Sequence, residues 1–244
     1  MRTTRIYTTQ RLSTGAVVQL EPEPSRHLAR ALRLGVGDTL TLFDGHGGEY
    51  PAEIIGVDKK YVQVVTGEHL SCERESTLVI HLGIAVSRGE RMDWVVQKST
   101  ELGVTALTPL LTEHTGVKLA GERANKKIQH WQQIAISACE QCGRNRPPVV
   151  YPLQSQAQWL ASTTAEQKFV LHHRADALAV PSETPGSIAL LVGPEGGLSE
   201  AEIAAAEQAG FAALRLGPRV LRTETAPIVA IALLQAHWGD MSLA

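Results

Sequence analysis

Two glycine-containing loops carry the residues of this chain that are best suited to chemistry. Residues 193–197 read Gly-Pro-Glu-Gly-Gly, and residues 217–225 read Gly-Pro-Arg-Val-Leu-Arg-Thr-Glu-Thr; each loop follows an apolar run that predicts a buried strand. Ligands of open α/β sheets bind at the carboxyl ends of the strands, and glycine lets the backbone approach a ligand closely. We therefore expect the two loops to wall a pocket for a small molecule.

The second loop has a composition that a plain turn would not need. Its polar residues Arg219, Arg222 and Glu224 are interspersed with the apolar residues Val220 and Leu221. The apolar side chains can anchor the loop to the protein while the polar side chains project from it. Neither loop has the spacing of a dinucleotide or P-loop phosphate cradle. No Ser-His-Asp order, His-Glu-x-x-His motif or paired-carboxylate signature indicates a hydrolase. A tight turn without a ligand is the alternative for the first loop.

The Cys-x-x-Cys motif at Cys139 and Cys142 predicts packing rather than chemistry. A zinc site needs four ligands, and no second pair supplies them. The motif lies at the end of a predicted helix, where the helix dipole raises a thiol pKa instead of lowering it. We expect no metal site. Arg144 and Asn145, just beyond the helix, could reach a phosphate or a base edge.

The N-terminal 35 residues are basic although the whole chain of 244 residues has a net charge of −2. A predicted helix over residues 25–34, with Ser25 as its N-cap, places three arginines at helical spacing. Such a ridge suits phosphate contacts, and a solvated surface helix is the alternative. The six arginines of this segment are Arg2, Arg5, Arg11, Arg26, Arg30 and Arg33.

The elements that must position these residues follow from the hydrophobic pattern. Short alternating segments over 16–20, 39–43, 50–57 and 61–65 predict a small β-barrel, and the polar stretch 71–76 predicts a linker. Beyond it, apolar runs over 78–86, 104–111, 169–172, 188–192 and 211–216 alternate with helical patterns over 90–102, 122–142, 199–210 and 226–238. This alternation predicts an open, mostly parallel α/β sheet. Lys98 and Glu101 are expected to form a surface ion pair on the first of these helices.

Composition places the chain among globular proteins, with 43% hydrophobic and 20% charged residues. No apolar run of about 18 residues predicts a membrane span, and the N-terminus lacks the apolar block of a signal peptide. Three cysteines cannot form a secreted disulfide framework. We expect a cytoplasmic protein.

Four motifs, at residues 97–103, 140–146, 191–198 and 216–225, resemble those of a known family. They are Gln-Lys-Ser-Thr-Glu-Leu-Gly, Glu-Gln-Cys-Gly-Arg-Asn-Arg, Leu-Val-Gly-Pro-Glu-Gly-Gly-Leu and Leu-Gly-Pro-Arg-Val-Leu-Arg-Thr-Glu-Thr. The family is that of the RsmE-type 16S ribosomal RNA uridine N3-methyltransferases, of the SPOUT class. The resemblance spans the whole chain and includes residues 5–7 and 87–90.

The resemblance implies an architecture of two domains. Residues 1–72 would form a PUA-like RNA-binding β-barrel. Residues 73–244 would form a SPOUT methyltransferase domain, with a mostly parallel sheet, helices on both faces and a C-terminal trefoil knot. The enzyme would be a homodimer that acts on 16S rRNA in the small ribosomal subunit, with each active site near the subunit interface.

The resemblance also implies roles for individual residues. S-adenosyl-L-methionine (SAM) would be held by Leu171, His172, Gly193, Glu195, Gly196, Leu216, Gly217, Leu221, Arg222 and Thr223. As a hypothesis for the mechanism, we expect Glu224 to take the proton of uracil N3, with Glu195 as the alternative base, and Arg222 to stabilise charge on uracil O2 or O4. RNA would be bound by Arg2, Arg5, Arg11, Arg26, Arg30, Arg33, Arg144 and Asn145.

Two other functions are compatible with the residues. A non-catalytic ribosome-assembly or RNA-binding protein would use the basic helix but would leave the two loops without a task. The other alternative is an unrelated small-molecule transferase with an accessory barrel.

Overall fold

The computed structural model describes residues 3–58, 60–117, 119–172 and 183–243, and its chain divides into two compact units. The first unit combines residues 1–75 with residues 139–147, and the second combines residues 76–138 with residues 148–244. The chain therefore passes between the units at residues 75–76, 138–139 and 147–148. Each unit is described by itself.

The first unit is built on a sheet with the strand order β1-β3-β4-β5-β2 within its described residues. The strands are β1 (Arg5–Tyr7), β2 (Val17–Gln19), β3 (Thr39–Phe43), β4 (Tyr50–Val57) and β5 (Val62–Thr66). β1 and β3 are parallel. The other neighbouring pairs, β3-β4, β4-β5 and β5-β2, are antiparallel. Alternate residues are buried on one face, because successive side chains of a strand point to opposite sides. The strands predicted over 16–20, 39–43, 50–57 and 61–65 are confirmed.

The helix predicted over residues 25–34 is wrong in its bounds and in its cap. α1 (Pro22–Arg26) begins earlier and continues into a wider π-type turn, η1 (His27–Ala31). Ser25 lies inside α1, where its buried hydroxyl donates to the Leu20 carbonyl oxygen and accepts from the Val62 backbone N–H. Arg33 follows the helical segment with a φ of +56°, so it leaves the ridge that Arg26 and Arg30 share.

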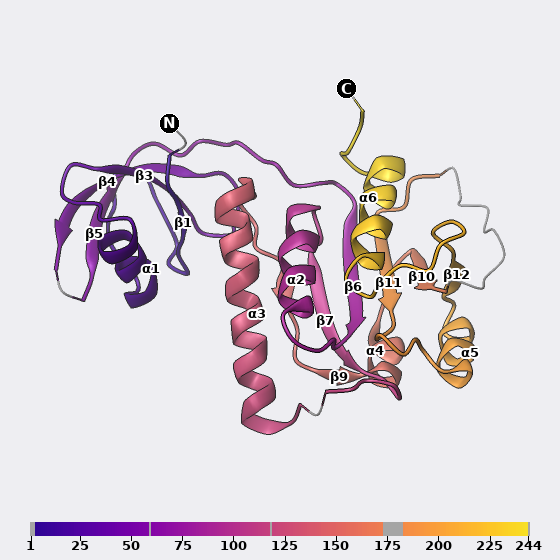
Figure 1. The fold of residues 1–244 in the computed structure, drawn as a ribbon. Helices are drawn as coiled ribbons and strands as arrows, with labels where there is room; N and C mark the ends of the chain where they lie inside the picture. Colours follow the sequence, from indigo (N-terminus) through magenta and orange to yellow (C-terminus); the bar gives the residue numbers. More distant parts are fainter. Residues whose placement is uncertain (1–2, 59, 118, 173–182, 244) are drawn as a thin grey trace. The chain divides into compact units, whose positions relative to one another are not determined.

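The second unit contains a seven-stranded sheet, counted over the residues that the structure describes (Figure 1). The strands are β6 (Val79–Ala85), β7 (Ala106–Leu111), β8 (Val149–Val150), β9 (Gln154–Ser155), β10 (Gln167–Leu171), β11 (Ser187–Val192) and β12 (Ala212–Leu214). Their order is β12-β10-β11-β6-β7-β8, β9 also pairs with β7, and these pairings are parallel. The predicted parallel α/β sheet is confirmed.

Helices cover both faces of this sheet because its strands are apolar on both sides. α2 (Arg91–Glu101), α3 (Gly121–Cys142) and α6 (Ala226–Trp238) pack in one core cluster with Ile188 and Leu190 of β11. α4 (Gln156–Ser162) and α5 (Glu200–Gln208) pack in another with Ala189 and Leu191, the alternate residues of the same strand. None of the helices in the described part of the chain has the length and hydropathy to cross a bilayer.

Helix ends in the second unit follow local rules. Ser199 forms the predicted capping box with Glu202 at the start of α5, and Gly103 takes a φ of +89° after α2. Ser155 forms an equivalent box with Gln158 at the start of α4. The sequence prediction assigned no helix there, although Ser-x-x-Gln was a readable signal.

Candidate active site

A cavity of about 770 Å³ lies at the carboxyl ends of β10, β11 and β12 in the second unit. The loop after β11, residues 193–197, and the loop after β12, residues 216–224, both line it. β10 runs between the two strands, and its end contributes Leu171 and His172 to the same cavity. The sheet order thus brings together two loops that are separated by 18 intervening residues in the sequence.

The structure brings every residue predicted to hold the cofactor to this one cavity. Its lining includes Leu171, His172, Gly193, Glu195, Gly196, Leu216, Gly217, Leu221, Arg222 and Thr223, and also Glu224. Their individual roles stay predictions.

Two glycines shape the first loop by leaving out a side chain. A Cβ atom added at Gly193 would lie 2.9 Å from Leu198 Cγ, and one added at Gly196 would lie 2.9 Å from His114 Cβ. His114 is itself held against the loop, since its Nδ1 lies 3.1 Å from the Gly197 carbonyl oxygen. Leu198 and His114 therefore pack against the loop, and a larger residue at either glycine would displace the cavity wall.

The second loop contains a short turn that fixes its last residues. The backbone N–H groups of Thr225 and Ala226 both donate to the Arg222 carbonyl oxygen, at 2.9 Å. Ala226 is the first residue of α6, so this turn joins the loop directly to a helix of the core. Glu224 lies inside the turn, and Thr223 is buried. The backbone that carries Arg222 and Glu224 is thus held by this turn and by the start of α6.

Arg91 lines the cavity too, and sequence reasoning missed it. Its Nη1 donates to Glu195 Oε1 at 2.7 Å, and its Nε lies 3.8 Å from Glu224 Oε2. The backbone N–H of Arg88 donates to the same Glu195 oxygen at 3.2 Å. Arg91 directly follows the motif at residues 87–90, which was the available signal.

The charge state of Glu195 follows from these contacts. Partial burial alone would raise the pKa of its carboxyl group. The hydrogen bonds from its own backbone N–H, from Arg88 N–H and from Arg91 outweigh burial, so the pKa of Glu195 lies below its usual value. Glu195 is therefore an ionised partner of Arg91 and a weak proton acceptor.

The cavity wall combines apolar and charged groups. The cavity wall holds four carboxylates, those of Glu195, Glu200, Glu207 and Glu224, and three guanidinium groups, those of Arg91, Arg219 and Arg222. These side chains give the wall an excess of one negative charge. Leu171, Val192, Ile203 and Leu214 are among its apolar side chains. Such a wall can bind an amphipathic ligand that carries a net positive charge.

The arginines predicted to bind RNA differ in exposure. Arg11, Arg26, Arg30 and Arg33 are exposed in the first unit, whereas Arg2 lies outside the described residues. The side chain of Arg5 is only 9% exposed. Its guanidinium group forms an ion pair with Glu49, donates to Asn145 Oδ1 at 2.6 Å and lies 4.9 Å from the Phe43 ring centroid. These contacts favour a structural task for Arg5.

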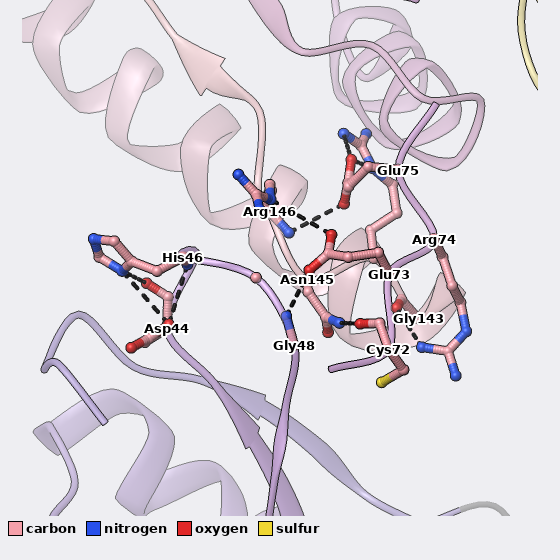
Figure 2. A network of polar contacts seen from close by, with 12 residues as sticks. Asp44, His46, Gly48, Cys72, Glu73, Arg74, Glu75, Gly143, Asn145 and Arg146 are labelled. Carbon is pink, nitrogen blue, oxygen red and sulfur yellow. Dashed lines mark hydrogen bonds and ion pairs between the residues drawn. The ribbon is translucent and has the colours of Figure 1, made fainter. Parts of the chain in front are cut away.

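Arg144 and Asn145 belong to an internal polar network of the first unit. Figure 2 shows this network with Asn145, Cys72 and Glu75 labelled. Arg144 is 4% exposed, and its Nη2 donates to Glu75 Oε2 at 2.6 Å. Asn145 is fully buried between Arg5 and the Cys72 carbonyl oxygen, to which its Nδ2 donates at 2.7 Å. RNA binding by these two residues stays a prediction, and their partners favour a role in tying residues 143–146 to residues 72–75.

The cysteines are reduced, and Cys139 is buried. A hydrogen bond with Cys142, together with burial, raises the pKa of the Cys139 thiol well above its usual range. The thiol is therefore not a thiolate nucleophile. Among the residues described, no three His, Cys, Asp or Glu side chains gather to hold a metal ion. The predicted ion pair on α2 is confirmed, with Lys98 Nζ 2.8 Å from Glu101 Oε1.

Comparison with known proteins adds an independent line. Residues 74–235 match the family described as "RNA methyltransferase domain", and residues 20–66 match "RNA methyltransferase PUA domain". A ribosomal RNA small subunit methyltransferase E from Buchnera aphidicola is 34% identical over 238 residues, which cover 97% of this chain and 94% of the relative. The protein of that name from Bacillus subtilis is 31% identical, with 93% of each chain covered.

Two solved structures share the fold over nearly their whole length. A ribosomal RNA small subunit methyltransferase E from Neisseria gonorrhoeae, bound to SAM, has a TM-score of 0.91 and 40% identity, over 99% of this chain and 100% of that one. A putative methyltransferase from Legionella pneumophila, also with SAM bound, has a TM-score of 0.95 and 44% identity over the same shares. The chain belongs to the ribosomal RNA small subunit methyltransferase E family. The resemblance inferred from the motifs is thereby confirmed.

Proposed function

We propose that this protein transfers the methyl group of SAM to N3 of a specific uridine in 16S rRNA of the small ribosomal subunit. The observation that carries the proposal is the single cavity where both glycine loops meet, with Arg222 and Glu224 in its wall. Family membership supports the donor, because the similar proteins from Neisseria gonorrhoeae and Legionella pneumophila bind SAM.

The residues present fit SAM. The molecule carries two positive charges and one negative charge, which complements a wall with one excess negative charge. It has no phosphate group, so the lack of a phosphate cradle in either loop is consistent with it. Backbone groups of the loops around Gly193, Gly196 and Gly217, with the apolar side chains Leu171, Leu216 and Leu221, would hold it. When bound, SAM supplies an electrophilic methyl group on a sulfonium.

The chain's own residues must prepare the acceptor. Uracil N3 carries a proton and lies on the Watson–Crick edge, so the base must be unpaired or turned outward. Glu224 accepts the N3 proton, and the electron pair left on N3 attacks the methyl carbon. The S–CH3 bond would break as the N3–CH3 bond forms, and its electron pair would leave with the sulfur as uncharged S-adenosylhomocysteine. Arg222 donates to O2 or O4, where the negative charge of the deprotonated ring collects. Glu195 is the weaker candidate base, since Arg91 and Arg88 N–H keep it ionised and hydrogen-bonded.

A second copy of the chain completes the proposal. Residues 226–234 of α6 are all apolar, so this part of the helix is apolar on all sides, yet Leu233 is 55% exposed. Trp94 on the adjacent helix α2 is 45% exposed. A helix that is apolar on all sides is normally buried. A homodimer that covers α6 and α2 would bury these side chains beside the site.

The remaining expectations join this proposal. Residues 1–72 act as a PUA-like RNA-binding barrel in which Arg11, Arg26, Arg30 and Arg33 contact phosphates. Residues 73–244 form the SPOUT domain with its trefoil knot, and the protein works in the cytoplasm. Support comes from the two family matches and from the exposure of these four arginines.

The deciding experiment maps modified nucleotides on small-subunit RNA from cells with and without the protein. We expect N3-methyluridine at one position only when the protein is present. Purified protein with SAM should also methylate small subunits but not free metabolites. Binding of subunits without methyl transfer would instead identify a non-catalytic assembly factor, and methylation of metabolites would identify a small-molecule transferase.

A further inference from the structure

We propose that Arg91 is a positioning residue: it holds the Glu224 carboxylate at the cavity wall and is itself anchored by Glu195. The inference rests on the proposed function, in which Glu224 accepts a proton. Neither Arg91 nor its helix belongs to the two loops that form most of the cavity wall, so Arg91 links α2 to both of them.

The position of Arg91 is unfavourable for the helix that carries it. Arg91 is the first residue of α2, where the positive end of the helix dipole repels a cation. Local structure therefore gives no reason for an arginine at this position. The compensation comes from elsewhere in the fold, because two carboxylates that follow 104 and 133 residues later in the sequence converge on its guanidinium.

The two contacts of Arg91 differ in kind. The distance of 2.7 Å to Glu195 Oε1 is that of a charge-assisted hydrogen bond, whereas 3.8 Å from Nε to Glu224 Oε2 is beyond hydrogen-bond range. Glu195 is also fixed by Arg88 N–H. Arg91 is thus tied firmly to the first loop and attracts Glu224 of the second loop without occupying its oxygen with a hydrogen bond.

The difference between the two contacts suits a proton acceptor, because the Glu224 carboxylate must be held in position and must still be free to accept a proton. The turn closed on the Arg222 carbonyl oxygen fixes the backbone of Glu224, and Arg91 directs its side chain. α2 also packs against α6, which begins two residues after Glu224. The helix therefore steadies both the side chain of Glu224 and the element that follows it. The planar fork of arginine can face two carboxylates at once, which the single ammonium of lysine does less well.

The test replaces Arg91 in the full chain and separates turnover from binding. R91Q is expected to lower kcat for methyl transfer to small subunits by about 100-fold, since a misplaced catalytic group costs that much. KM for SAM and the melting temperature should stay near the wild-type values. K98Q is the matched control, because it removes a cation and one ion pair from the same helix two turns further on, and its kcat should equal that of wild type.

Two further variants test the route of the effect. R91K should recover part of kcat because it keeps the charge. At saturating SAM, R91Q/E195Q should be no slower than R91Q alone, since Glu195 acts by anchoring Arg91. Independent, multiplicative losses would overturn the inference, and so would R91K as slow as R91Q.

The failures of the two proposals are distinguishable. Wild-type protein that binds SAM but methylates no RNA would refute the proposed function. Active wild-type protein with an equally active R91Q would refute the positioning role alone. A joint fall of kcat, SAM affinity and melting temperature in R91Q would also refute it, because that pattern reports a merely structural contact.

Discussion

Arg222 combines exposure to solvent with a place in the cavity wall, so its side chain can be removed with little effect on the core. We expect Arg222→Ala to reduce methyl transfer by about 10²- to 10³-fold, as the loss of one charge-stabilising donor does. The free energy of unfolding should change by no more than about 0.5 kcal/mol. Methyl incorporation from labelled SAM and a urea titration would measure the two quantities. Wild-type turnover in the variant would reject this role for Arg222.

Glu224 gives a prediction with a pH signature. Glu224→Gln keeps the size of the side chain but cannot accept the N3 proton. Methyl transfer should be lost near neutral pH and return in part at alkaline pH, where N3 loses its proton to solvent. The rate at a series of pH values, compared with Arg222→Ala, would show it. If alkaline pH restores nothing, another group is the base.

The sequence allowed the cavity residues to be predicted but not the contacts among them. Gly193, Gly196 and Arg222 stand in motifs with a readable local purpose. Arg91 acquires its partners only through the tertiary fold, since Glu195 and Glu224 lie far along the chain. For the same reason Asn145 suggested RNA contact from its flanking arginines, whereas folding surrounds it with Arg5 and Cys72.

At the scale of elements, the loop after β11 depends on the absence of a side chain. Gly196→Ala would bring a Cβ within 2.9 Å of His114 Cβ, and relieving such a clash costs about 1–3 kcal/mol. The loop should shift and SAM affinity should fall by about tenfold or more, which calorimetric titration would measure. Gly35→Ala is a control, because nothing lies within 4 Å of its added Cβ. Unchanged SAM affinity in Gly196→Ala would separate this loop from the donor.

The helical segment formed by α1 and η1 gives a second prediction at this scale. Arg30→Glu should weaken binding to small-subunit RNA and reduce the slope of log affinity against log salt by about one. Arg30 is exposed, so the fold and SAM affinity should be unaffected. Filter binding at several salt concentrations would measure the slope. An unaltered slope would leave this segment as an ordinary solvated surface.

Prediction of the elements succeeded where a single local rule decided the outcome. Alternation and apolar runs located the long strands, and Ser199 with Glu202 located α5. The segment over 25–34 failed because Ser25 satisfies the Leu20 carbonyl and the Val62 N–H, which belong to neighbouring elements of the unit. β8 and β9, of two residues each, are too short for any periodicity to reveal.

At the scale of the whole molecule, His81 links stability to pH. It lies on β6 with Thr108 Oγ1 at 2.8 Å and Trp159 Nε1 at 3.3 Å from its Nε2, and Tyr151 packs on its ring. Burial lowers the pKa of His81 from 6.5 to about 4. The folded protein keeps it neutral, while the unfolded chain binds a proton below pH 6.5.

The sign of the effect follows from that difference. The stabilising contribution is complete above pH 6.5, decreases as the pH falls towards 4, and changes no further below it. The slope contributed by this group is at most about 1.4 kcal/mol per pH unit. Urea unfolding between pH 7 and pH 4 would measure it, and His81→Gln should show a shallower dependence. Equal slopes in both proteins would mean that His81 does not titrate on unfolding.

The excursion of residues 139–147 into the first unit makes the two halves of the molecule inseparable by a single cut. A fragment ending at residue 72 would lack Glu140, which accepts from the Tyr7 N–H, and Asn145, which is one of the acceptors of the Arg5 side chain. Its N-terminal strand would keep β3 and Glu49 as partners but would lose these two contacts, so such a fragment is a poor substitute for the intact first unit. A protease that cleaves the chain between residues 75 and 76 would leave two fragments. Residues 139–147 of the second fragment would still pack in the first unit, so the two fragments should migrate as one species until they are denatured.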